Sequence, residues 1–273
     1  MRSIGSVGES SDLAARVEAA GWYQRDWGPA MLDGWAVRTA DAALVEAEDR
    51  VVDVGCGTGV VARECARRVG AAGSVTGIDP NEAMLTIAKR MGGEIVWLEG
   101  RAEDLPLPDR SCDKVVSQFA MMFFGDRITA ASEMWRVLAP GGRMAVVVSG
   151  PIEATPQYEA LVDLARLHMG EDVADDMGGR FALGDIEAVA SIFDRAGIAG
   201  FEIETVWGWE RFRSASGFAE AEVRSSAALA DLLDELAFEA MLTDADELMQ
   251  EMLDSEGRLV FKSPAHVVTA VKP

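Results

Sequence analysis

The sequence is poor in histidine, cysteine and basic residues. Its 273 residues include 2 His and 3 Cys, and 25 Lys and Arg stand against 46 Asp and Glu, which gives a formal charge of −21. Such a surface repels phosphate backbones, so we expect no nucleic-acid partner. Cys56, Cys65 and Cys112 form no CxxC pair. We therefore expect a reducing compartment and no metal site.

Long apolar runs and targeting signals are also missing. No run approaches the roughly 20 apolar residues that span a bilayer, and no charged start is followed by an apolar stretch. We expect a soluble, cytoplasmic protein that does not contact membranes. Residues 1–11 are rich in Gly and Ser, and we expect them to be disordered because they have little apolar surface to bury.

From residue 50 onward, short apolar runs alternate with stretches of helical periodicity. This pattern is typical of βαβ units and predicts an α/β fold in which helices cover both faces of a mainly parallel sheet. The predicted helices of the core are 60–69, 81–90, 128–138 and 185–196. The predicted strands are 51–54, 75–78, 95–98, 115–119, 144–148, 201–207 and 266–271.

Two interruptions divide the predicted core. Residues 12–150 form its first part, 151–183 a helical cap insertion, and 184–273 the rest of the core with a second helical insertion at 212–256. In that second insertion, Leu229, Leu232, Leu233 and Leu236 repeat at helical spacing, which predicts an amphipathic helix. It packs on the cap, or alternatively forms a homodimer interface. Trp207 and Trp209 are expected to pack beneath the same insertion.

The string VVDVGCGTG at residues 51–59 places a carboxylate in an apolar strand and glycines directly after it. A buried, unpaired carboxylate is costly, so Asp53 is expected to meet a hydrogen-bond donor. The glycines remove side chains at the carboxyl end of the strand, where open α/β sheets bind ligands. A tight turn with Thr58 as N-cap is the structural alternative. Val60 occupies the third-glycine position of a dinucleotide fingerprint, which disfavours a pyrophosphate.

Asp79 ends the second predicted strand. An acidic side chain at this point can accept hydrogen bonds from both ribose hydroxyls, which indicates a nucleoside ligand. Alternatively, Asp79 is the N-cap of the next helix, with Pro80 at N1 and Glu82 at N3.

Five strings, VVDVGCGTG, GIDPNEAML, GRAEDLPLPD, CDKVVSQFAMMFF and VLAPGGRMAVVV, follow one another along the chain. In order and spacing they resemble the class I S-adenosylmethionine-dependent methyltransferases, most closely their ubiquinone and menaquinone biosynthesis-like branch. The resemblance implies a Rossmann-like αβα sandwich with a seven-stranded, mostly parallel sheet whose last strand is antiparallel, plus helical cap insertions. It also implies an enzyme of class EC 2.1.1.- that uses S-adenosyl-L-methionine and releases S-adenosyl-L-homocysteine.

The resemblance assigns roles to individual residues. Asp79 is assigned to the ribose, Pro80 and Met84 to the faces of the adenine, Ala102 to the ring through its N–H, and Glu103 to the exocyclic amine. Tyr23 and Trp27 lie in a region that closes over the cofactor in related enzymes, and Met122 and Phe123 are assigned to the acceptor side. The residues assigned to the methionine part of the cofactor and its methyl group are Asp53, Gly55, Cys56, Gly57, Gly59, Ser117, Gln118 and Phe119.

Many relatives carry a histidine pair where Met122 and Phe123 stand. We therefore expect positioning and desolvation to promote methyl transfer more than a strong general base does. His168, at the end of the first cap helix, is the candidate base and is expected to face the methyl group, whereas His266 is expected to be structural.

The predicted function is methyl transfer to an oxygen, carbon or nitrogen atom of a small, partly apolar metabolite. Two alternatives remain open. One is an NAD(P)-dependent oxidoreductase, which shares the strand, the glycine loop and the acidic residue. The other is a non-catalytic cofactor-binding or regulatory protein of the same fold.

Overall fold

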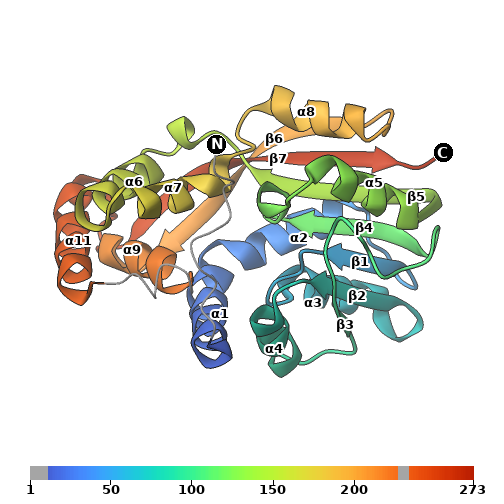
Figure 1. Ribbon diagram of the computed structural model, residues 1–273, viewed down its shortest axis with the longest axis horizontal. Helices are drawn as coiled ribbons and strands as arrows, with labels where there is room; N and C mark the ends of the chain where they lie inside the picture. The colour runs from blue at the N-terminus through green and yellow to red at the C-terminus, as the bar shows by residue number, and fades with distance from the viewer. Residues whose placement is uncertain (1–11, 227–233) are drawn as a thin grey trace.

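A seven-stranded sheet in the order β3-β2-β1-β4-β5-β7-β6 runs through the molecule (Figure 1). The computed structural model describes residues 12–226 and 234–273, so the expected disorder of residues 1–11 lies outside the described residues. The strands are β1 (Arg50–Val54), β2 (Ser74–Asp79), β3 (Val96–Glu99), β4 (Cys112–Gln118), β5 (Leu138–Ser149), β6 (Glu202–Phe212) and β7 (Leu259–Val271).

The first five strands pair in parallel, and β7 runs antiparallel to both of its neighbours, β5 and β6. This confirms the predicted Rossmann-like sheet with an antiparallel last strand. The β2, β1 and β4 register brings Asp53 beside Gly77 and Val116. The carboxyl ends of these three strands therefore meet at one edge of the sheet, where open α/β folds bind ligands.

Ten helices are present in the described part of the chain. Within residues 12–226 and 234–273, none is both long and apolar enough to cross a bilayer. The helices are α1 (Leu13–Trp27), α2 (Asp33–Ala42), α3 (Val60–Val69), α4 (Glu82–Arg90), α5 (Arg127–Val137), α6 (Pro156–Met169), α7 (Glu171–Gly178), α8 (Ile186–Arg195), α9 (Ala215–Arg224) and α11 (Glu235–Leu248), with short helical turns at Gly28–Leu32, Gly70–Ala72, Met121–Phe123, Ile152–Ala154, Gly179–Phe181 and Gln250–Met252.

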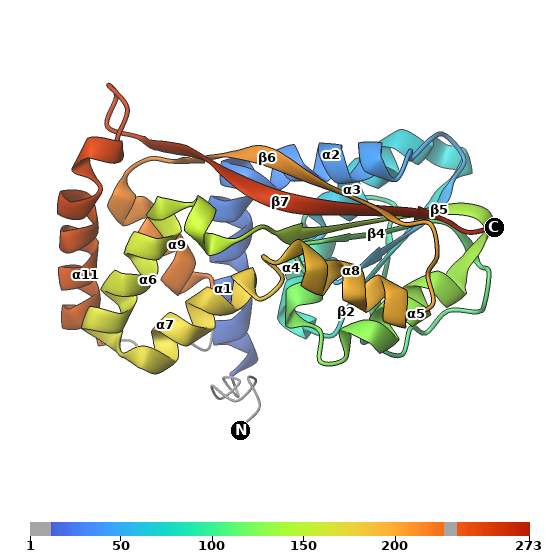
Figure 2. The ribbon, with the colours of Figure 1, turned by 90° about the horizontal axis from the view of Figure 1, so that it is seen from above.

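The two faces of the sheet are covered by different helices (Figure 2). Ala40 of α2 and Cys65 of α3 are buried against one face, and Met134 of α5 and Phe193 of α8 against the other. Burying each large apolar side chain contributes about 1.5–3 kcal/mol. Because helices cover both faces, the central strands carry apolar side chains on both sides. The sheet is therefore the middle layer of a three-layer sandwich.

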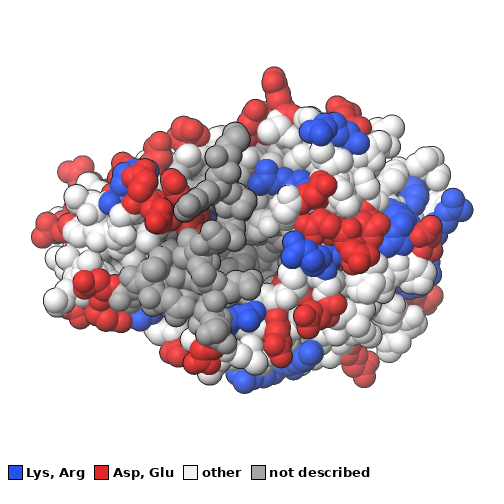
Figure 3. Space-filling model, viewed as in Figure 1, with Lys and Arg blue, Asp and Glu red and all other residues white. Residues whose placement is uncertain are grey.

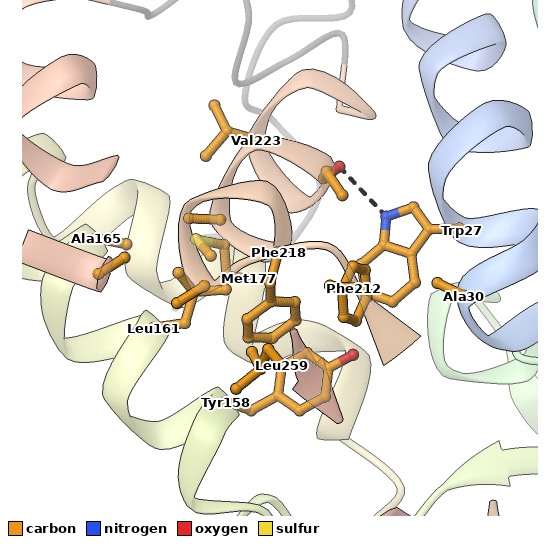
Figure 4. Close-up of a cluster of buried hydrophobic side chains, with 14 of the residues drawn as sticks. Trp27, Ala30, Tyr158, Leu161, Ala165, Met177, Phe212, Phe218, Val223 and Leu259 are labelled. Atoms are coloured by element: carbon orange, nitrogen blue, oxygen red, sulfur yellow. Dashed lines mark hydrogen bonds between the residues drawn. The ribbon is translucent and has the colours of Figure 1, made fainter. Parts of the chain in front are cut away.

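A helical cap lies beyond one end of the sheet. Helices α6 and α7 follow β5, while α9 and α11 connect β6 to β7, whose paired ends extend past the other strands (Figure 2). Tyr158, Phe212 and Phe218 pack edge to face or tilted in the cluster of Figure 4. The Trp27 indole N–H donates to the Ala221 carbonyl at 3.2 Å. The N-terminal helix is therefore joined to the cap.

Three sequence predictions about the second insertion need comment. Trp207 and Trp209 are 47% and 45% exposed, so the prediction that they pack beneath the insertion is wrong. Alternation along β6 instead turns Gly208 and Glu210 inward. The predicted helix through Leu229, Leu232 and Leu233 lies outside the described residues. Leu236, the last member of that stripe, is 80% exposed, so it does not pack on the cap.

Candidate functional site

A cavity of about 310 Å³ opens at the carboxyl ends of β1, β2 and β4. We refer to it as the loop cavity because the glycine loop after β1 forms one wall. It brings together eleven of the residues predicted from the sequence. They are Tyr23, Asp53, Gly55, Cys56, Gly57, Asp79, Pro80, Met84, Gln118, Phe119 and Phe123.

Gly57 and Gly59 of the loop are required for different structural reasons. Gly57 has a φ of +53° and open space where a Cβ would stand, so the loop leaves room at the cavity. Gly59, the N-cap of α3, has a φ of +83°, and a Cβ there would lie 2.3 Å from the Trp97 ring. Gly59 does not line the loop cavity, so its close approach to Trp97 of β3 explains this glycine. Thr58 is not the N-cap and lines the loop cavity.

Asp53 is buried in β1 with one carboxylate oxygen unsatisfied. Among the described residues, no donor lies within hydrogen-bond distance of its Oδ2. Burial, with a contribution from nearby Asp79, raises the pKa of Asp53 to about 7, although the Ala62 N–H and Arg63 oppose this. The expected protein donor is therefore absent for one oxygen within the described chain, and a ligand that offers a cation or an N–H fits there.

Asp79 organises the loop from the end of β2. Its Oδ2 accepts from the Gly57 N–H and its Oδ1 from the Asn81 N–H, both at 2.8 Å. Burial raises its pKa. The N-cap of α4 is Asn81, which accepts from the Ala83 N–H at 3.0 Å, so the capping alternative for Asp79 is wrong. Each carboxylate oxygen keeps a lone pair that a ligand hydroxyl can use.

Glu103, Ala102 and Ser117 lie apart from the loop cavity. Ala102 and Glu103 line a neighbouring cavity of about 50 Å³. Glu103 Oε1 accepts from the backbone N–H groups of Gly125 and Asp126 at 2.8 and 3.1 Å. This oxygen therefore holds the loop before α5, while the expected contact of Glu103 with an exocyclic amine stays a prediction. Ser117 is fully buried within β4 and lines none of these cavities.

A second cavity, of about 240 Å³, lies between the loop cavity and the helical cap. We call it the cap cavity. Tyr23, Met84, Phe119 and Phe123 line both cavities. The other residues of the cap cavity are Trp27, Met31, Met122, Asp176, Met177, Arg180, Glu222, Ser225 and Ser226.

Phe119 stands at the junction of the two cavities in a strained conformation. Its φ of +50° is in the left-handed region, which non-glycine residues rarely adopt outside functional sites or turns. Its N–H donates to the Val147 carbonyl at 2.8 Å, and its ring packs edge to face on Trp35 at 5.5 Å. The surrounding structure therefore holds this ring between the two cavities.

Polar groups around the junction are fixed by residues that the sequence did not single out. Gln118 Oε1 accepts from the Thr39 hydroxyl at 2.8 Å, and Gln118 Nε2 donates to the Leu32 carbonyl at 3.3 Å. Burial raises the pKa of Tyr23 to about 12. Its phenol, on a residue that lines both cavities, is therefore protonated at neutral pH.

His168 needs correction as the candidate base. Its Nε2 lies 2.7 Å from Asp244 Oδ2 on α11, and it lines neither cavity. It connects α6 to α11 and does not face the junction. His266 lies between the Thr205 hydroxyl and the Gly184 carbonyl, at 2.9 and 2.8 Å. Both of its ring nitrogens are satisfied, as expected of a structural histidine.

The chain resembles known methyltransferases in sequence and in fold. A family described as a methyltransferase domain matches residues 52–146. The demethylmenaquinone methyltransferase of Thermus thermophilus is 40% identical over 121 residues, which cover 43% of this chain and 54% of that protein. The ubiquinone/menaquinone biosynthesis C-methyltransferase UbiE of Idiomarina loihiensis is 30% identical over 190 residues, covering 64% and 76%.

Among solved structures, the YcgJ protein from Bacillus subtilis matches 87% of this chain and 97% of its own, with a TM-score of 0.56 at 21% identity. At this identity the similarity shows the fold alone. The chain spans about half the length of the first curated relatives that it matches.

Proposed function

Because the chain belongs to the class I S-adenosylmethionine-dependent methyltransferases, in their ubiquinone/menaquinone biosynthesis-like branch, we propose that it methylates a small molecule. The donor is S-adenosyl-L-methionine, and the acceptor is a partly apolar metabolite methylated on oxygen, carbon or nitrogen. The observation that carries this proposal is the junction at Phe119, where the loop cavity meets the mainly apolar cap cavity.

The residues of the loop cavity fit the cofactor. Asp53 Oδ2 and Thr58 Oγ1 are buried without partners in the described chain, which suits the polar methionine end of the ligand. Asp79 would hold the ribose, and Pro80 and Met84 would flank the adenine. S-adenosylmethionine, when bound, supplies an electrophilic methyl group on sulfur.

The protein's own contribution is to position the acceptor and exclude water. Phe119, Phe123 and Met122 provide apolar wall at or beside the junction, and the Tyr23 phenol supplies a hydrogen-bond donor. Fixing two reactants in a near-attack geometry can contribute about 7–11 kcal/mol toward the barrier. Of the residues that the structure describes, no histidine lines either cavity. This favours positioning over general-base catalysis by an imidazole.

Acceptor choice has to be inferred from the cap cavity. The quinone acceptors named for the relatives do not transfer directly, because the chain spans only about half the length of the first of these relatives. Asp176, Arg180 and Glu222 of the cap cavity also lie outside residues 52–146, which the methyltransferase-domain family matches. The buried, unpaired cysteines agree with a cytoplasmic enzyme, which we also propose. Residues 151–183 and 212–256 are proposed to act as the acceptor-binding insertions.

Calorimetry with S-adenosylhomocysteine and with NADH tests the cofactor. We expect binding of S-adenosylhomocysteine at one site per chain and no binding of NADH. Binding of NADH alone would instead support the oxidoreductase alternative. A mass-spectrometric assay with a panel of phenols, amines and quinols then follows S-adenosylhomocysteine production. Cofactor binding without turnover on any acceptor would support the non-catalytic alternative.

A further inference from the structure

The cap cavity contains a carboxylate that has no partner within residues 12–226 and 234–273. Asp176 lines this cavity, and no hydrogen bond or ion pair joins its side chain to the rest of the described chain. It is exposed to solvent, at the edge of a wall that includes Met31, Met122 and Met177. An unpaired charge beside apolar surface is available for a ligand.

The position of Asp176 in its helix is unfavourable for a carboxylate. It lies in the last turn of α7 (Glu171–Gly178), where the helix dipole favours cations. Burial raises its pKa, and no neighbouring positive charge offsets the effect. Both effects act against the charged form of Asp176, which a cationic group on a ligand would stabilise.

The other charged groups of the cap cavity neutralise each other. Arg180 Nη1 lies 2.9 and 3.2 Å from the two carboxylate oxygens of Glu222. The guanidinium also packs on the rings of Trp27 and Tyr158, at 4.6 and 4.9 Å from their centroids. With this pair neutral, the ionised carboxylate of Asp176 leaves the lining with a net negative charge.

We propose that the acceptor carries a cationic amine, which binds Asp176 while the apolar part of the acceptor lies against the methionine and aromatic wall. The aromatic ring of Tyr23, which lines the same cavity, adds favourable surface for an ammonium group. A carboxylate or phosphate on the acceptor would instead meet Asp176 and Glu222, with the Arg180 guanidinium already engaged. This inference rests on the proposed function, because it treats the cap cavity as the acceptor site.

Three naphthalene probes that differ in charge test whether the site prefers a cation. They are 2-naphthylmethylamine (cationic), 2-naphthalenemethanol (neutral) and 2-naphthoate (anionic). Their affinities are measured by calorimetry on the protein saturated with S-adenosylhomocysteine. We expect the amine to bind at least fivefold more tightly than the alcohol, and the carboxylate most weakly. Raising the salt concentration should reduce the preference for the amine, since Asp176 is exposed to solvent.

Asp176→Asn and Asp175→Asn provide the matched comparison. Both remove one negative charge from the same helical turn, but Asp175 does not line the cavity. We expect Asp176→Asn to abolish the preference for the amine over the alcohol and Asp175→Asn to retain it. S-adenosylhomocysteine affinity should be unchanged in both, which also shows that both variants fold.

Equal preferences in the two variants, or tightest binding of the carboxylate by the wild type, would overturn the inference. Failure of the proposed function has a different signature. In that case, the wild-type protein would not bind S-adenosylhomocysteine at all.

Discussion

At the scale of single residues, two acidic side chains on adjacent strands have different tasks. Asp79 has protein donors on both oxygens, whereas Asp53 Oδ2 has none in the described chain. The sequence identified both positions, because a carboxylate within an apolar strand is unusual. The sequence could not show which carboxylate oxygen lacks a donor. That depends on the loop geometry, which directs the N–H groups of Gly57 and Asn81 to Asp79 and leaves Asp53 Oδ2 without a partner in the described chain.

Asp53 should make the stability of the cofactor-free protein depend on pH. Its pKa is raised from 3.8 to about 7, so the stabilisation linked to its neutral form is complete below pH 3.8 and is lost as pH rises through about 7. Asp53→Asn, which stays neutral, should therefore unfold at higher urea concentration than the wild type at pH 8. The difference, up to about 4 kcal/mol, should disappear near pH 3.5.

Asp113→Asn is a control for which the opposite pH dependence of stability is expected. The Arg50 guanidinium holds the pKa of Asp113 below its usual range, so this variant should lose stability at pH 8 and match the wild type at low pH. Identical pH profiles for Asp53→Asn and the wild type would show that the Asp53 carboxylate does not titrate near neutrality.

Asp79→Ala should weaken S-adenosylhomocysteine binding by roughly 2–4 kcal/mol, because hydrogen bonds to a charged acceptor contribute about 1.5–3 kcal/mol each and are not fully additive. Loss of the bond to the Gly57 N–H should add to this effect. Calorimetry measures the change. Asp126→Ala removes an N-cap that accepts from Ile128 and Thr129, so it should lower the melting temperature while leaving cofactor affinity unchanged.

At the scale of helices and strands, periodicity predicted the core well. Predicted boundaries of α3, α4, α5 and α8 lie within about a residue of those observed, because their apolar faces pack on one sheet. The ends of β6 and β7 were missed. Residues 208–212 and 259–263 pair with each other beyond the core, where their burial depends on cap helices far away in the sequence.

The charge pairing in the cap cavity was harder to predict for the same reason. Arg180 precedes α8 and Glu222 belongs to α9, so their pairing crosses 42 positions of the chain. Neither residue belongs to a motif. Individual charges in the cap were visible in the sequence, but their convergence on one cavity depends on how the turn Gly179–Phe181 lies against α9.

The Arg180 and Glu222 pair should stabilise the cap mainly by avoiding unpaired charge. Arg180→Met leaves Glu222 without its partner and should reduce the free energy of unfolding by about 3–5 kcal/mol. The double variant Arg180→Met with Glu222→Gln removes both charges and should recover most of this loss. Urea denaturation of the four proteins measures the coupling. Equal stability of the single and double variants would contradict this account.

At the scale of the whole molecule, negative charge covers both the core and the cap. In the view of Figure 3, acidic side chains recur over both parts, with basic groups between them. The formal charge of −21 should prevent association with nucleic acids. We expect no shift in the anisotropy of a fluorescent DNA duplex at micromolar protein and 50 mM salt, conditions that favour phosphate contacts. Binding that weakens with salt would reveal a local basic surface.

The first cap segment leaves and re-enters the core at nearly the same place. Gly150 donates its N–H to the Pro264 carbonyl at 2.9 Å, and a Cβ on Gly184 would lie 2.7 Å from the Pro151 Cα. Segments whose ends lie together can be exchanged with little disturbance of the surrounding backbone. Residues 151–183 are thus suited to being grafted as a unit between enzymes of this fold. In evolution or in the laboratory, exchange of this segment would change the range of acceptors while the β1–β2 edge, which we propose binds the cofactor, stays intact.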